Sequence, residues 1–291
     1  MSDQFGCPAY SDTRVLVVRY GTLASNRSRI FLNYHLYNEP DSRQDLDYFF
    51  WIIDGPEGVI LVDTGFSVDA GHARGREMLV DPRAVVADLG LALDDVAAII
   101  VTHAHYDHVG NLRYFPNANL YIASAEYDFW TSPTAEHLQF AKLCESDEIE
   151  ELRRAAREGR LVTIDQDLKV APNVSVEVVG GHTPGQAIVT VTTANGAVLI
   201  ASDAVHLLEE LHRDMPFIAV TDLPALYAAF DLIRSRVASG AILLSGHDPL
   251  TLDMFPALEG PLGQFVRVAG STDLTAGLGR HIEFADPEEE R

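Results

Sequence analysis

Short apolar runs separated by turn residues fill the first half of the chain, a pattern that predicts β-strands. Residues 48–53 and 59–62 flank Gly55-Pro56-Glu57-Gly58, which is typical of a hairpin turn. Residues 97–101 form a short buried run that leads directly into a histidine-rich stretch. The pattern predicts three strands, a helix and two strands, at residues 14–20, 48–53, 59–62, 84–89, 97–101 and 119–123.

The second half opens with an interrupted apolar stripe at helical spacing, which predicts a helix over residues 135–158. Asn195-Gly196 indicates a hairpin between two strand-like runs, and Thr221-Asp222 offers an N-cap to a helix that runs through residue 235. Strands are predicted before and after this helix, at residues 174–179, 187–193, 197–201 and 241–244.

The order of these elements also predicts the architecture. We find no repeat, linker or low-complexity stretch, which favours one domain over residues 1–291 with its core at about 14–268. Two strand-rich halves, each with helices, predict an α/β fold in which two sheets pack face to face with helices outside.

Composition narrows the classes of partner. The 291 residues are 47% hydrophobic, which is ample for a large core, and carry a formal net charge of -22. Such a charge repels nucleic acids and anionic membranes, so we expect neither as a partner and expect a small neutral substrate. We interpret the acidic residues 282–291 as a frayed tail.

The cysteines and the N-terminal residues indicate the cellular compartment that we expect for the protein. Cys7 and Cys144 are the only cysteines and lie far apart, which argues against a disulfide framework and favours a reducing compartment. The first residues lack the apolar core of a signal peptide, and no stretch reaches about 18 uninterrupted apolar residues. We therefore expect a cytoplasmic protein.

Four candidate metal ligands lie within six residues in His103-Ala104-His105-Tyr106-Asp107-His108, directly after the strand predicted at 97–101. The chain changes direction there, so these side chains can converge on one point. Imidazoles and carboxylates suit zinc and similar divalent ions, and a set without cysteine is typical of a catalytic site. A solvated polar loop is the alternative interpretation.

Three further candidates follow predicted strands, namely His182, Asp203 and His247. Each is a weak signal alone, because a single histidine or aspartate is more often a surface or capping residue. Together with the histidine-rich motif they supply seven nitrogen or oxygen donors, more than one tetrahedral zinc uses. We therefore predict two divalent ions, zinc first, with manganese, cobalt and iron as alternatives.

The order of the motifs resembles the metallo-β-lactamase superfamily, and within it the N-acyl homoserine lactonase group. The resemblance covers about residues 14–248. It rests on five ordered motifs, namely Val62-Asp63-Thr64-Gly65, the histidine-rich motif, Gly181-His182-Thr183-Pro184-Gly185, Ser202-Asp203-Ala204 and Ser245-Gly246-His247-Asp248. It implies an αββα sandwich with the site at one edge, between the sheets.

The resemblance also implies roles for the ligands. One metal would be held by three histidines, namely His103, His105 and His182. The second would be held by Asp107, His108 and His247, and Asp203 would bridge the two metals. A bridging hydroxide would be the nucleophile, because two nearby cations lower the pKa of a shared water. Asp107 would pass a proton to the departing alkoxide. Asp63 would accept a hydrogen bond from a metal-bound imidazole, with capping of the turn at Gly65 as its alternative role.

His206 departs from the lactonase pattern. Members of that group carry a tyrosine three residues after the bridging aspartate, where this chain has His206. We predict that His206 acts beside Asp107 as a catalytic residue by donating a hydrogen bond to the substrate carbonyl. A partly exposed residue at a helix start is the alternative. The departure bears on the choice of substrate and leaves the hydrolytic machinery intact.

Seven aromatic residues are candidates for lining an apolar pocket, although most are expected in the core, namely Phe49, Trp51, Phe66, Phe129, Trp130, Phe140 and Phe217. Residues 66–81 carry weak structural cues, and we interpret them as a lid or a dimer arm. The sequence leaves open whether the chain forms a homodimer.

The leading hypothesis is a hydrolase that opens a lactone or carboxylic ester, with N-acyl homoserine lactone as the first candidate. A thioesterase of the glyoxalase II type shares the metal set and stays open as an alternative. A β-lactamase is disfavoured because zinc β-lactamases generally lack the bridging aspartate, and a phosphodiesterase because nothing obvious in this acidic chain binds phosphate. A di-iron redox protein is disfavoured because that group usually has glutamate in place of His105.

Overall fold

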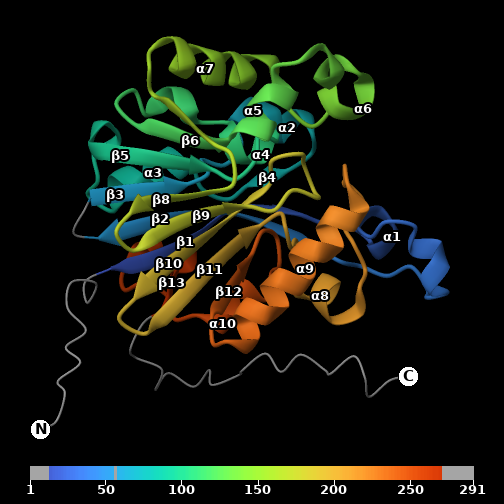
Figure 1. Ribbon diagram of the computed structural model, residues 1–291. Helices are drawn as coiled ribbons and strands as arrows, with labels where there is room; N and C mark the ends of the chain where they lie inside the picture. The colour runs from blue at the N-terminus through green and yellow to red at the C-terminus, as the bar shows by residue number, and fades with distance from the viewer. Residues whose placement is uncertain (1–12, 56–57, 271–291) are drawn as a thin grey trace, which may run out of the picture.

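The computed structural model describes residues 13–55 and 58–270, which form two β-sheets packed face to face with helices on their outer sides (Figure 1). The predicted α/β architecture is therefore confirmed. Cys7 and the acidic residues 282–291 lie outside the described residues. Within residues 13–55 and 58–270, no helix is long and apolar enough to cross a bilayer.

The first sheet is mixed and has eight strands. Its β13–β3 part is antiparallel, whereas β3, β5, β6 and β7 pair in parallel. In spatial order the strands are β13 (Val266–Ala269), β1 (Arg14–Leu23), β2 (Leu46–Gly55), β3 (Gly58–Val62), β5 (Val96–Val101), β6 (Asn119–Ala123) and β7 (Leu161–Ile164), with β4 (Glu77–Met78) also paired to β1. Gly55 pairs with Gly58, which confirms the first predicted hairpin.

The second sheet has five strands. In spatial order they are β12 (Ile242–Ser245), β11 (Gly196–Ser202), β10 (Ala187–Thr193), β9 (Val174–Val178) and β8 (Asp167–Ala171). β11 and β12 are parallel and the other neighbours are antiparallel. Thr193 pairs with Gly196, which confirms the second predicted hairpin.

Short helices cover the outer faces of both sheets and connect the strands (Figure 1). They are α1 (Arg27–Ile30), α2 (Val68–Ala73), α3 (Pro82–Asp88), α4 (Tyr106–Val109), α5 (Ser124–Trp130), α6 (Leu138–Ala141), α7 (Ser146–Arg157), α8 (Leu208–Arg213), α9 (Leu223–Ala238) and α10 (Thr251–Met254). The helices predicted at 84–89 and through residue 235 correspond to α3 and α9.

The alternation of side chains along β2 shows how the layers are held together. Phe49 and Trp51 pack between the two sheets, whereas Phe50 and Ile52 pack outward against the helices. Every second residue of a strand faces the same side, so a strand covered on both faces must be apolar throughout. The continuous apolar run of β2 therefore places it at the centre of the sandwich.

The helix predicted over residues 135–158 is wrong as a single element. The chain forms instead η4 (Pro133–Glu136), α6 and α7. Between α6 and α7, the carbonyl oxygen of Leu143 accepts a hydrogen bond from the Tyr106 N–H at 2.9 Å, and Arg74 pairs with Glu145. These long-range contacts outweigh the local helical spacing at the break.

Residues 66–81, interpreted as a lid or a dimer arm, are packed against the first sheet. They contain α2 and β4, and the Leu79 N–H donates to the carbonyl oxygen of Tyr20 at 2.8 Å. Phe66 is fully buried, with its ring centroid 4.7 Å from that of Tyr20. This packing argues against a free lid, and the dimer arm stays a prediction.

Candidate metal centre

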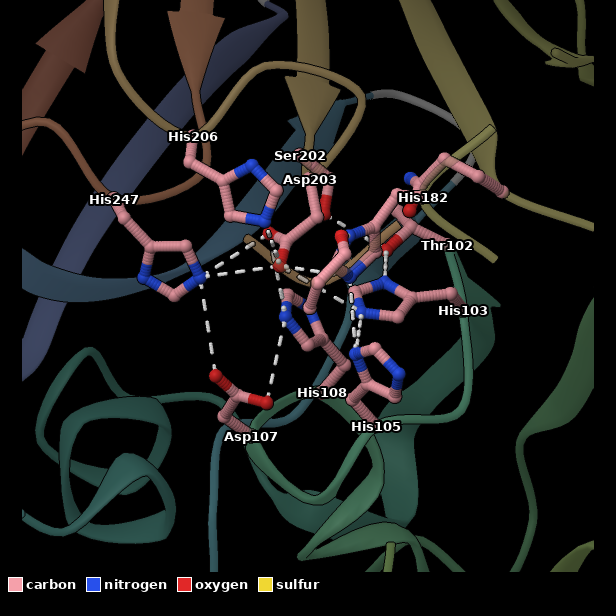
Figure 2. Close-up of polar contacts among 12 residues, drawn as sticks. Thr102, His103, His105, Asp107, His108, His182, Ser202, Asp203, His206 and His247 are labelled. Atoms are coloured by element: carbon pink, nitrogen blue, oxygen red, sulfur yellow. Dashed lines mark hydrogen bonds and ion pairs between the residues drawn. The ribbon is translucent and has the colours of Figure 1, made fainter. Parts of the chain in front are cut away.

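The seven predicted ligands come together at the ends of strands from both sheets (Figure 2). His103, His105, Asp107 and His108 lie in the loop after β5 and in α4. His182 lies in the β9–β10 loop, Asp203 directly follows β11, and His247 follows β12. Because β11 and β12 are parallel, with Ser202 opposite Ser245, the residues that follow them lie at the same edge.

A glycine fixes the loop that carries His182. Gly181 has a φ of +92°, and a Cβ at this position would lie 2.6 Å from the Cα of Leu226 in α9. The carbonyl oxygen of Gly181 accepts hydrogen bonds from the N–H groups of Thr221 at 3.0 Å and Asp222 at 2.9 Å. The loop is therefore pinned to the start of α9, and a side chain at this glycine would push His182 away from the other ligands.

Three imidazole nitrogens converge in the first group of ligands. His105 Nδ1 lies 3.0 Å from His103 Nε2 and 3.0 Å from His182 Nε2. Asp203 Oδ2 faces the same point, 3.4 Å from His182 Nε2 and 3.7 Å from His103 Nε2. The four side chains are buried, and their ligand atoms lie within 4.8 Å of one another.

Asp107, His108 and His247 form the second group, also within 4.8 Å of one another. Asp107 Oδ1 lies 3.8 Å from His108 Nε2, and its Oδ2 lies 3.8 Å from His247 Nε2. Asp203 Oδ1 lies 3.5 Å from His108 Nε2 and 3.2 Å from His247 Nε2. Asp203 Oδ2 also lies 3.3 Å from His247 Nε2, so the Asp203 carboxylate stands between the two groups, in the place that a bridging ligand would take.

Hydrogen bonds on the outer side of the centre fix the tautomers of two imidazoles. His182 Nδ1 lies 2.8 Å from the carbonyl oxygen of Ala219, and His247 Nδ1 lies 2.8 Å from that of Asp47. A carbonyl oxygen only accepts, so both Nδ1 atoms carry the proton. In the neutral imidazole, Nε2 is then a bare lone pair that faces inward.

The same reasoning extends to His103 and His108. Asp63 Oδ2 accepts a hydrogen bond from His108 Nδ1 at 2.7 Å, which is the contact expected of Asp63. Thr102 Oγ1 donates its proton to Asp63 Oδ2 at 2.7 Å and lies 3.3 Å from His103 Nδ1, so that nitrogen must be the donor toward the hydroxyl. Four imidazoles thus direct Nε2 toward the centre through contacts with protein oxygens.

Burial keeps the first group of imidazoles unprotonated. Loss of hydration lowers the pKa of His103 and His182 well below the usual value, and that of His105 to about 4. Burial raises the pKa of Asp203, but the surrounding imidazoles, His247 first, outweigh this and hold it well below its usual value. Neutral imidazoles and an ionised carboxylate are the forms that bind metal.

Buried polar atoms without a hydrogen-bond partner, and ring nitrogens whose lone pairs face one another, show that the centre fits cations. Among the described residues, His108 Nε2 and Asp203 Oδ1 are buried without a hydrogen-bond partner. Burial lowers the pKa of His108, but the carboxylates of Asp203, Asp63 and Asp107 outweigh this and raise it well above the usual value. The field at the centre therefore favours positive charge, and five imidazoles with two carboxylates suit two zinc-type ions.

His206 also lies inside the centre. Its Nε2 is 3.1 Å from Asp203 Oδ2 and its Nδ1 is 3.3 Å from Glu210 Oε1. Phe217 stacks on its ring with centroids 3.7 Å apart. Its exposed fraction is 1%, so the alternative of a partly exposed residue is wrong, although it does precede α8. Burial lowers the pKa of His206, but Asp203 and Glu210 outweigh this and raise it to about 9.

The aromatic candidates divide between the core and the centre. Phe49, Trp51 and Phe66 are fully buried in the core, and Phe129 packs on Phe140. Trp130 packs against His105 with ring centroids 5.4 Å apart, and Phe217 covers His206. Sequence reasoning missed the fully buried Glu126 beside the centre, because no motif marks it, and it also missed Thr102 and Glu210.

Comparisons with known proteins agree with this geometry. The family model of the metallo-beta-lactamase superfamily matches residues 45–240. An N-acyl homoserine lactonase of Bacillus sp is 28% identical over 225 residues, which cover 72% of this chain and 84% of that protein.

Solved structures share the fold. A quorum-quenching N-acyl homoserine lactone lactonase superposes with a TM-score of 0.69 at 23% identity, covering 83% of this chain and 95% of that one. AidC, a dizinc quorum-quenching lactonase, has a TM-score of 0.67 at 20% identity, covering 83% and 90%. The family model spans more than half of the sequence, and the chain therefore belongs to the metallo-β-lactamase superfamily.

Proposed function

We propose that the protein is a dinuclear metal-dependent hydrolase that opens a lactone or carboxylic ester, with N-acyl homoserine lactone as the first candidate substrate. The observation that carries the proposal is the inward-facing set of bare ring nitrogens around Asp203, whose carboxylate contacts ligands of both groups. The lactonases among the relatives support the substrate class. We also retain the expectation of a cytoplasmic location, since Cys144 forms no disulfide within the described residues.

Zinc is the first choice of metal, and two ions would be held by the seven ligands, which are His103, His105, His182 and Asp203 at the first position and Asp107, His108, His247 and Asp203 at the second. When bound, such a pair supplies a hydroxide nucleophile and Lewis acidity at the scissile carbonyl. Asp63 holds the His108 ring so that Nε2 faces inward. Loss of the Asp63 carboxylate is expected to lower activity by weakening metal binding.

Asp107 and His206 are the residues proposed to act on the substrate itself. Asp107 lies opposite Asp203 across the centre (Figure 2), its oxygens 3.8 Å from His108 Nε2 and His247 Nε2, and no hydrogen-bond donor of the described residues holds its carboxylate. A carboxylate in that place can take up a proton and deliver it to the departing alkoxide. His206 is proposed to donate a hydrogen bond from Nε2 to the substrate carbonyl.

A substrate panel tests the function. N-acyl homoserine lactones, simple esters, thioesters of the glyoxalase II type and β-lactams would be offered to the zinc-loaded protein. We expect kcat/KM to be highest for a lactone or an ester. A thioester preferred over every lactone and ester, or no hydrolysis of any of them, would contradict the proposal.

His206→Ala is expected to lower lactone hydrolysis by about 1–3 kcal/mol of transition-state stabilisation, or roughly 5- to 150-fold, with metal content unchanged. The reason is the loss of one hydrogen bond to the carbonyl. His206→Tyr should recover part of the loss or shift kcat/KM between substrates. His72→Ala, an exposed histidine on α2, is the control. Equal rates for histidine, alanine and tyrosine on every substrate would show that His206 has no contact with substrate.

A further inference from the structure

Glu126 is a fully buried carboxylate that joins two loops carrying metal ligands. It is the third residue of α5, which follows β6. Its Oε1 accepts a hydrogen bond at 2.9 Å from the N–H of Ala104, which stands between two ligands of the first group. Its Oε2 accepts one at 2.9 Å from the N–H of Gly185, in the loop that carries His182.

The two loops come from different sheets. Ala104 follows β5 of the first sheet, whereas Gly185 lies between β9 and β10 of the second. A Cβ at Gly185 would lie 2.4 Å from the backbone nitrogen of Glu126, so the second loop rests directly on the first turn of α5. The φ of Gly185 is not positive, so close approach, and not backbone conformation, requires glycine there.

Trp130 adds a third contact to the same carboxylate. Its indole N–H donates to Glu126 Oε1 at 2.7 Å, and its ring packs edge-on against the imidazole of His105. Both oxygens of Glu126 thus accept hydrogen bonds from groups that lie beside first-group ligands. The positions of these donor groups set where the first-group imidazoles lie. No hydrogen bond described for the chain joins Glu126 to Asp107, His108 or His247 of the second group.

We propose that Glu126 is a positioning residue that sets the metal affinity of the first ligand group by holding its two loops, one from each sheet, at a fixed separation. The inference rests on the dinuclear centre of the proposed function. Loss of a group that orients metal ligands typically costs about 10- to 100-fold in metal affinity. The loss should be confined to one of the two metal positions.

Glu126→Gln tests the inference without any substrate. Glutamine replaces one acceptor oxygen by an NH2 group, so in either orientation one of the loop N–H groups faces a donor. Stepwise Zn²⁺ dissociation constants would be measured by competition with a chromophoric chelator, and Co²⁺ absorption would report the ligand environment of each position. We expect one constant to weaken by about 10- to 100-fold and the other to stay within a few fold.

Glu148→Gln is a matched control. Glu148 is also a buried glutamate at the third position of a helix, α7, but neither of its oxygens has a hydrogen-bond partner within the described residues. Both zinc constants should stay unchanged in this variant. Glu126→Asp, which keeps the charge but withdraws the carboxylate by one methylene, should give a smaller loss at the same metal position as Glu126→Gln.

Unchanged constants in Glu126→Gln, or an equal loss at both positions, would overturn the inference. Failure of both Glu126 variants to fold would make it a folding residue and would equally reject the positioning role. A wild-type protein that binds fewer than two ions would instead contradict the dinuclear centre of the proposed function, before any variant is compared.

Discussion

Replacing Asp107 by asparagine is expected to lower kcat for lactone hydrolysis by a factor of hundreds or more, while the protein stays folded. The substitution weakens a ligand of the second group and removes the carboxylate proposed to protonate the leaving alkoxide. The backbone at this position is held independently, because its carbonyl oxygen accepts a hydrogen bond from the Tyr20 hydroxyl at 2.8 Å.

Steady-state kinetics on protein of measured metal content would test this prediction. A substrate with a better leaving group needs less help from an acid, so the deficit of Asp107→Asn should shrink on an aryl ester. Wild-type rates in a fully metallated variant would show that another group protonates the leaving oxygen.

Asp203→Asn is expected to have the larger effect, because one side chain faces both ligand groups. An amide carries no charge. It presents an NH2 group to imidazole nitrogens that face a carboxylate oxygen in the wild-type protein. We expect metal content to fall below two ions per chain and kcat/KM to fall by about a thousandfold, or about 4 kcal/mol.

Asp47→Asn is the control for this variant. Asp47 is also buried, but its side chain pairs with Arg19 and only its backbone carbonyl contacts the centre. It should keep both metal ions. If Asp203→Asn held two ions with wild-type affinity, the bridging role of Asp203 would be wrong.

The ligand positions could be predicted from the sequence because each follows a predicted strand, and the strands before His103 and His247 are short apolar runs. Val96–Val101 leads into His103, and Ile242–Ser245 leads into His247, so the ends of buried strands mark the edge where the ligands meet. The resemblance to a known family supplied the pairing of the ligands into two groups, which spacing alone does not give.

Other features depend on contacts that no local pattern records. Glu126 has no motif, and its importance arises only when β5 and the β9–β10 loop meet at α5. β8 alternates polar and apolar residues over only five positions, none of them fully buried, and its place in the second sheet is decided by its pairing to β9. The break between α6 and α7 is likewise set by the contact of Leu143 with Tyr106.

The dinuclear centre is the central claim, and titration of metal-stripped protein with Zn²⁺ tests it most directly. Bound zinc, by elemental analysis after desalting, and hydrolysis of an N-acyl homoserine lactone would be followed in the same samples. We predict that binding saturates at two ions per chain and that activity, absent from the stripped protein, reaches its plateau only as the second ion binds. Full activity in the stripped protein, or saturation at a single ion, would contradict the account.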